Sequence, residues 1–70
     1  MIREQVSSSM IQEIGFDKEK EILEVEFNTG NIFQYEDVPE EIYDDLMEGV
    51  SIGKTFNELI RNKFKFERVD

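Results

Sequence analysis

The residues with the clearest chemical potential in this 70-residue chain form a basic and aromatic segment near its C-terminus. Its members are Arg61, Lys63, Phe64, Lys65, Phe66 and Arg68. Cationic side chains interleaved with aromatic rings suit the phosphates and bases of a nucleic acid. The simpler interpretation is structural, because cations stabilise the C-terminal end of a helix. In addition, four cationic side chains would contact few phosphates of a nucleic acid. The segment is a candidate anion-binding patch, and we prefer the structural interpretation.

The segment Gly49–Thr55 resembles a phosphate-binding P-loop, whose backbone amides wrap around a phosphate. The P-loop pattern places one more residue between its first glycine and its Gly-Lys pair than the three found here. The segment also follows an expected helix, whereas a P-loop follows a strand. We therefore expect a connection between two helices.

Two further groups of polar residues are better explained by structure than by chemistry. Glu24 and Glu26, with Glu36 and Glu13, are expected on the outer face of a sheet, where they could bind a divalent cation or a basic partner. A flat face lacks the turn that wraps a cation, so we expect solvated carboxylates. The hydroxyls of Ser7–Ser9 have no base to activate them and are expected to make local turn or capping bonds.

Phe33 and Tyr35 are the aromatic residues for which a structural and a functional role compete. They are separated by one residue, so both rings point to one face of a strand. Such a pair can stack on the bases of a single-stranded nucleic acid. The same face carries Leu23 and Val25 and must be covered by other apolar residues. We expect both rings in the core, with the Tyr35 hydroxyl able to reach the surface.

Composition excludes most catalytic chemistry. The chain contains no Cys and no His, so it has no disulfide, no thiolate metal ligand and no histidine-dependent nucleophile. We therefore expect no catalytic residues, no metal site and no cofactor. The longest apolar runs have two residues and the N-terminus lacks an apolar signal region, which indicates a cytoplasmic protein with no membrane contact.

The charge is strongly negative and unevenly distributed. Eight Lys and Arg residues stand against 17 Asp and Glu residues, for a net charge of −9. Residues 1–53 hold three basic and 14 acidic residues, whereas residues 54–70 hold five basic and three acidic ones. A field of this sign opposes docking onto nucleic acid or anionic membranes. A phosphate contact would therefore have to use the C-terminal residues.

Hydrophobic periodicity predicts a single α+β domain over residues 1–70. Leu23, Val25 and Phe27 alternate with glutamates, which is the clearest strand signal in the chain. Strands over residues 14–16 and 32–36 flank this one across a turn and a hairpin loop, giving a three-stranded antiparallel meander. Ile11 is out of phase with residues 14–16, which indicates a bulge or a later start of the first strand.

The residues after the meander predict a two-helix hairpin packed on the apolar face of the sheet. Pro39 begins the first helix, Asp37 and Glu40 have the spacing of a capping box, and Gly49 ends the helix. Ser51 caps the second helix. Residues 64–69 return to a weak alternation, which predicts a short C-terminal strand or an extended tail.

The ordered set of residues resembles the KTSC domain, a family named for its occurrence at the C-terminus of some lysyl-tRNA synthetases. The resemblance covers nearly the whole chain and rests on Val6–Ser9, Ile14–Asp17, Leu23–Phe27, Gly30, Phe33–Tyr35, Val38–Pro39, Tyr43, Leu46, Ser51, Gly53, Phe56–Asn57, Ile60–Arg61 and Phe64–Phe66. It implies a small bacterial protein of no established activity, for which RNA binding is suggested by the association with the synthetases.

The resemblance also implies particular residues. The family's central Tyr-x-Tyr motif falls on Phe33 and Tyr35, so the first hydroxyl is absent here. Asn57 and Arg61 become candidate site residues, because they are four apart on the second expected helix and so share a face.

Two hypotheses about function follow. The first is a non-catalytic binding or accessory module whose partner is a protein, which is favoured by the net charge, the small size and the missing catalytic groups. The second is a weak RNA or tRNA binder that uses the basic C-terminal residues. The candidate binding surface is Tyr35, Lys54, Asn57, Arg61, Lys63, Lys65 and Arg68. An enzyme that uses carboxylates and Tyr35 is the least supported alternative, and the sequence assigns no oligomeric state.

Overall fold

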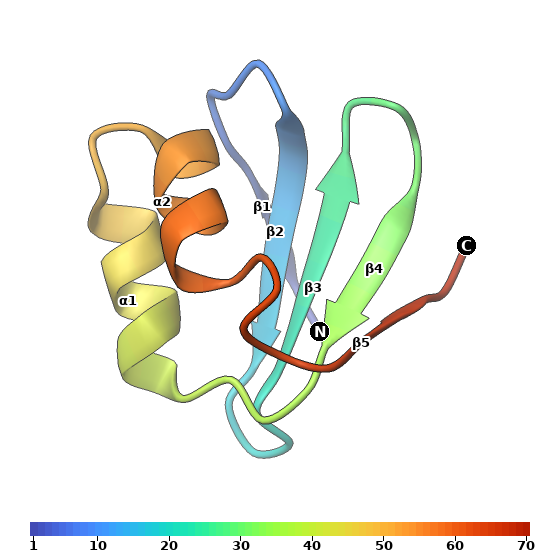
Figure 1. Ribbon diagram of the computed structural model, residues 1–70. Helices are drawn as coiled ribbons and strands as arrows, with labels where there is room; N and C mark the ends of the chain where they lie inside the picture. Colours follow the sequence, from blue (N-terminus) through green and yellow to red (C-terminus); the bar gives the residue numbers. More distant parts are fainter.

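The chain forms a five-stranded antiparallel sheet with two helices on one of its faces, in a computed structural model that describes residues 1–70 (Figure 1). The strands are β1 (Arg3–Gln5), β2 (Ile11–Asp17), β3 (Ile22–Phe27), β4 (Ile32–Tyr35) and β5 (Phe66–Arg68), and the helices are α1 (Glu40–Glu48) and α2 (Ile52–Leu59). The strands lie in chain order across the sheet. Both helices come between β4 and β5 in the sequence, although these two strands are neighbours in the sheet. The predicted α+β class is confirmed.

The sheet has two strands more than the predicted meander of three. Of the two alternatives for residues 64–69, a short strand and an extended tail, the structure shows the strand, β5, which pairs antiparallel with β4. Strand β1 was not expected, because its three residues are all polar and show no apolar alternation. It is held by its partner instead: Arg3 pairs with Gly15 and Gln5 with Glu13.

Alternation along the central strands builds the core. Ile14, Leu23 and Val25 are fully buried, and Ile11 joins them because the register shifts between Ile11 and Glu13. Of the two alternatives that the phase of Ile11 left open, a bulge and a later start of the strand, the structure shows the bulge, since a regular strand would point Ile11 away from Ile14. The core comprises Ile11, Ile14, Leu23, Val25, Tyr35, Val38, Leu46, Phe56 and Ile60.

The helix ends follow the predicted residues but not all of the predicted caps. Ser51 caps α2, and its Oγ accepts a hydrogen bond from the backbone amide of Lys54 at 3.4 Å. Pro39 precedes α1 without any side-chain cap, so the capping box expected from Asp37 and Glu40 is wrong. Asp37 instead adopts a left-handed conformation with φ of 57°, which turns the chain between β4 and the helix. Gly49 ends α1 in an extended conformation with φ of −65°.

The open face of the sheet carries a network of charges centred on Arg3. The guanidinium of Arg3 lies 2.9 Å from Glu26, 3.3 Å from Glu24 and 3.4 Å from Glu13. The expected cluster of solvated carboxylates therefore includes a cation, whereas Glu36 stands outside it. No group of acidic residues is arranged to hold a metal ion.

Gly15 makes room for this network. Gly15 on β2 is the cross-strand partner of Arg3 on β1. A Cβ at Gly15 would lie 2.7 Å from Cγ of Arg3. The missing side chain lets the arginine stem cross β2 and reach Glu13 on β2 and Glu24 and Glu26 on β3. No helix of the protein is long and apolar enough to cross a membrane.

An aromatic cleft as the candidate functional site

The most apolar hollow of the protein is a cleft between α2 and the strands β4 and β5, which we call the aromatic cleft. Its volume is about 410 Å³. Its aromatic lining is Phe27, Phe33, Tyr35, Phe56 and Phe66, and the other lining residues are Met10, Asn57, Arg61 and Asn62. In Figure 1 the chain after α2 crosses over to the far edge of the sheet, where β5 lies beside β4. The cleft therefore forms where this crossing leaves β4 uncovered by a helix.

The rings of the cleft pack on one another from the floor to the rim. Tyr35 and Phe56 form the floor: they are buried, and their ring centres lie 5.5 Å apart in an edge-to-face contact. Phe33 and Phe66 stack in parallel at 5.4 Å, and Phe66 remains 52% exposed. The prediction that Tyr35 is a core residue is confirmed, whereas Phe33 is only partly buried and lines the cleft.

Polar groups at the cleft come from α2 and from the turn that follows it. Arg61 and Asn57 both line the cleft, as their spacing suggested. They do not share a helix, because α2 ends at Leu59 and Ile60 is its C-cap. Arg61 directly follows this C-cap, so its charge also lies at the C-terminal end of α2.

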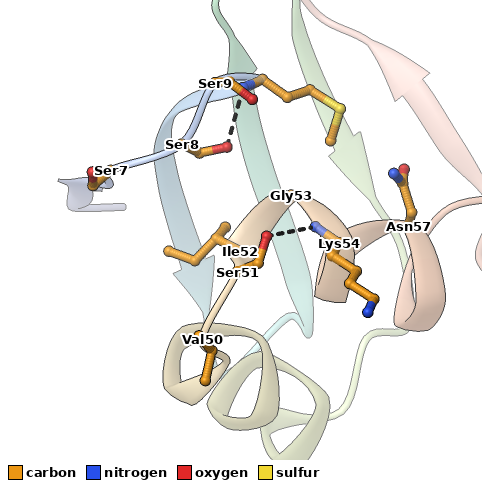
Figure 2. A pocket seen from close by; sticks show the side chains of 10 residues that line it. Ser7, Ser8, Ser9, Val50, Ser51, Ile52, Gly53, Lys54 and Asn57 are labelled. Carbon is orange, nitrogen blue, oxygen red and sulfur yellow. Dashed lines mark hydrogen bonds between the residues drawn. The ribbon is translucent and has the colours of Figure 1, made fainter.

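A second, more polar pocket adjoins the cleft, and we call it the serine pocket (Figure 2). It has a volume of about 480 Å³ and lies between the loop that precedes β2 and the start of α2. Its residues are Ser7, Ser8, Ser9, Met10, Val50, Ser51, Ile52, Gly53, Lys54 and Asn57. Met10 and Asn57 line both hollows, so the two are neighbours, and we refer to them together as the concave surface.

Among the three serines expected to make local bonds, Ser8 does so. Oγ of Ser8 accepts hydrogen bonds from the backbone amides of Met10 and Ile11 at 3.1 and 3.2 Å. Gly53 brings the first turn of α2 close to this loop, since a Cβ at Gly53 would lie 3.4 Å from Oγ of Ser8. Gly49–Thr55 is thus the connection between two helices that the sequence predicted. Lys54 is one of the residues that line the pocket, and its side chain runs away from the serine loop in Figure 2.

The structure brings together four of the seven predicted surface residues. Tyr35, Asn57 and Arg61 line the aromatic cleft, while Lys54 lies in the serine pocket. Lys63, Lys65 and Arg68 line neither hollow. Arg68 is paired instead with Asp70 at 2.9 Å, and this hydrogen bond lowers the pKa of the Asp70 carboxyl. Met10, Phe27, Phe56 and Asn62 line the cleft but were not predicted.

Comparison with known proteins places this arrangement in a family. The family model of the KTSC domain matches residues 7–64. The chain belongs to the KTSC domain family. A crystal structure of a KTSC domain protein from Yersinia pestis superimposes with a TM-score of 0.96 at 36% identity, covering 99% of this chain and 97% of that one.

Relatives of this KTSC domain occur alone and within a larger protein. An uncharacterized protein from Stutzerimonas stutzeri is 38% identical, with 100% of both chains covered. A lysine–tRNA ligase from Nostoc punctiforme is 34% identical over 87% of this chain, which corresponds to 11% of the ligase. The resemblance expected from the sequence is confirmed, and the relatives that match over their whole length carry no functional name.

Burial of the tyrosines in this KTSC domain has a measurable consequence at alkaline pH. Burial raises the pKa of Tyr35 above its ordinary value of 10.0, although the nearby charge of Arg61 lowers it by a smaller amount. Burial, with the charges of Glu4 and Asp44, also raises the pKa of Tyr43. Above pH 10.0 the unfolded chain therefore loses its phenolic protons before the folded protein does.

We expect the free energy of unfolding to be insensitive to the tyrosines below pH 10.0 and to fall as the pH rises above it. Urea unfolding of the wild type and Tyr35→Phe at successive alkaline pH values measures this dependence. The variant should lose less stability than the wild type over the same pH interval, because only Tyr43 then contributes. Equal losses in the two proteins would show that Tyr35 has no raised pKa.

Proposed function

We propose that this KTSC domain is a non-catalytic binding module that holds an apolar side chain of a partner protein in the aromatic cleft. The observation that carries this proposal is the half-exposed ring of Phe66 above a floor of packed aromatic rings. Binding energy at protein interfaces is concentrated where an aromatic or aliphatic anchor enters a pocket that excludes water. The cleft, at about 410 Å³, has the size of such a pocket.

The inventory of titratable groups supports a binding role rather than catalysis. General acids and bases are tuned by burial and by charged neighbours, and this tuning marks catalytic sites. Among the groups with shifted pKa values here, two are tyrosines and the other two are the exposed Arg68–Asp70 pair. Neither hollow contains a nucleophile beside a base.

RNA is the second candidate partner. Lys54, Asn57 and Arg61 share one concave surface with aromatic rings, which is the combination used to bind single strands. Two of the relatives are named lysine–tRNA ligases, and the tRNA in that name is the reason to consider RNA as a partner. Against this stand the net charge of −9 and the position of Lys63, Lys65 and Arg68 outside both hollows. Protein is therefore our leading choice.

An amide-resolved NMR titration distinguishes these partners. The probes are short capped peptides whose central residue is phenylalanine, leucine or alanine, and bulk tRNA at low and near-physiological salt. We expect the phenylalanine and leucine peptides, but not the alanine peptide, to shift the amide signals of Phe33, Tyr35 and Phe66. Shifts that appear only with tRNA and persist at the higher salt would favour the RNA candidate.

The matched variants are Phe66→Ala and Ile2→Ser. Phe66 is half exposed at the cleft, and Ile2 is 88% exposed beside β1 at the opposite edge of the sheet. Phe66→Ala should weaken binding of the phenylalanine peptide by about tenfold, the size of a single interface anchor, whereas Ile2→Ser should leave it unchanged. Equal binding by both variants would contradict the cleft as the binding site.

A further inference from the structure

The two hollows differ from the rest of the protein in charge. The chain has 17 Asp and Glu residues, yet none of them lines the aromatic cleft or the serine pocket. The charged residues at these hollows are Arg61 in the cleft and Lys54 in the pocket. A concave surface with positive charges and no carboxylates, set in an acidic protein, complements a ligand that carries negative charge locally.

Both cations are available to a ligand. The ion pairs of the protein occupy Arg3, Lys18 and Arg68, whereas Lys54 and Arg61 have no carboxylate within 4.0 Å. Lys20, Lys63 and Lys65 are also unpaired, but they lie outside the two hollows. Only Lys54 and Arg61 therefore combine a free charge with a place on the concave surface.

The arrangement of groups around the cleft fits an anion beside an apolar side chain. Arg61 lies close enough to the cleft floor for its charge to act on the Tyr35 phenol. Asn57 and Asn62 also line the cleft and offer amide donors for carbonyl or carboxylate oxygens. A guanidinium can bind a carboxylate through two parallel hydrogen bonds, which fixes orientation as well as charge.

We propose that the aromatic cleft selects a protein segment in which an aromatic or long aliphatic side chain is flanked by acidic residues, and that Arg61 binds one of the flanking carboxylates. This inference rests on the proposed function, since the same cleft must first accept the apolar side chain. Lys54 lines the adjoining serine pocket, which shares Asn57 with the cleft. The net charge of −9 disfavours such a segment over most of the remaining surface.

Three capped pentapeptides test the charge preference. The first has phenylalanine between two aspartates, the second has phenylalanine between two asparagines, and the third has alanine between two aspartates. NMR titration should show that the first binds about fivefold tighter than the second, as expected for partly exposed ion pairs. The third should not shift the cleft signals. Equal affinities for the first two peptides would overturn the charge preference.

The variant Arg61→Gln assigns the preference to one residue. It should reduce the ratio of the first two affinities toward one, because the aspartate peptide loses an ion pair that the asparagine peptide never makes. Lys20→Gln is the matched control, because it removes the same charge from an exposed, unpaired residue in the turn between β2 and β3. The control should keep the full preference. A preference that survives Arg61→Gln, or is lost equally in both variants, would overturn the role of Arg61.

Failure of this inference is distinguishable from failure of the proposed function. If both phenylalanine peptides bind the cleft with equal affinity, the charge preference is wrong and the binding module stands. If neither peptide shifts the cleft signals, both proposals are wrong. A single-stranded oligonucleotide serves as the final probe: binding that depends on Arg61, without any peptide binding, would assign the surface to nucleic acid and overturn the inference.

Discussion

The Phe56→Ala variant is expected to lose about 3–5 kcal/mol of the free energy of unfolding, the usual cost of emptying a buried phenylalanine site. Phe56 is 2% exposed and is the aromatic residue through which α2 enters the core. Its ring makes edge-to-face contacts with Phe27 at 5.6 Å and with Tyr35 at 5.5 Å. A domain of this size has a total stability of roughly 4–10 kcal/mol, so the variant should be largely destabilised.

Urea unfolding followed by circular dichroism measures this loss, and Phe66→Ala is the matched control. The same atoms are removed from Phe66, but its ring is half exposed at the rim of the cleft. We expect the control to lose about 1 kcal/mol or less, because little apolar surface leaves the protein interior. Similar losses in the two variants would mean that the floor and the rim of the cleft are not packed differently.

The Gly15→Val variant is expected to lose about 1–3 kcal/mol of the free energy of unfolding, the range found for overpacked sites. A Cβ at this position would lie 2.7 Å from Cγ of Arg3 and 3.2 Å from the backbone oxygen of Ile2. The arginine stem can move, but the backbone of β1 can move only by leaving β2. The Arg3 guanidinium would then lose its contacts with glutamates of β2 and β3.

Amide hydrogen exchange locates this loss. In Gly15→Val the amides that pair β1 with β2 should exchange faster, whereas those between β3 and β4 should keep their protection. Arg3→Met separates the two causes, because it keeps an apolar stem over Gly15 and removes only the charge. We expect a smaller loss from Arg3→Met. A Gly15→Val protein with wild-type exchange would show that β1 does not depend on the gap above this glycine.

Strong local patterns in the sequence were sufficient for the central sheet and the helices. Alternation over Leu23, Val25 and Phe27 was sufficient to predict β3. The phase of Ile11 indicated an irregularity that could be a bulge or a later start of the strand, and the bulge is found. Strand β1 could not be predicted, because Arg3–Gln5 has no apolar period and becomes a strand only through pairing with β2. Asp37 was misread as a cap because its left-handed conformation depends on the turn from β4 into α1.

The site was predictable in its parts but not in its shape. The sequence correctly placed Phe33 and Tyr35 on one strand face. Asn57 and Arg61 line one cleft, although Arg61 lies beyond the end of α2 and not on the shared helix face that their spacing predicted. The sequence could not show that the helices leave β4 uncovered, because this depends on where the helices pack across the sheet. Phe66 forms the rim of the cleft on β5. It lies far along the chain from β4 and reaches this strand only through the pairing of β4 with β5.

Strand order also sets the sequence of events during synthesis on a ribosome, where chains grow from the N-terminus. Four neighbouring strands emerge before either helix, so the nascent sheet has no cover for its apolar side until Phe56 and Ile60 have been added. During that interval the glutamates of β2 and β3 keep the other side of the sheet charged and hydrated. Phe66 follows later still, and a partner that needs its ring meets a competent surface only after the rest of the domain has been made.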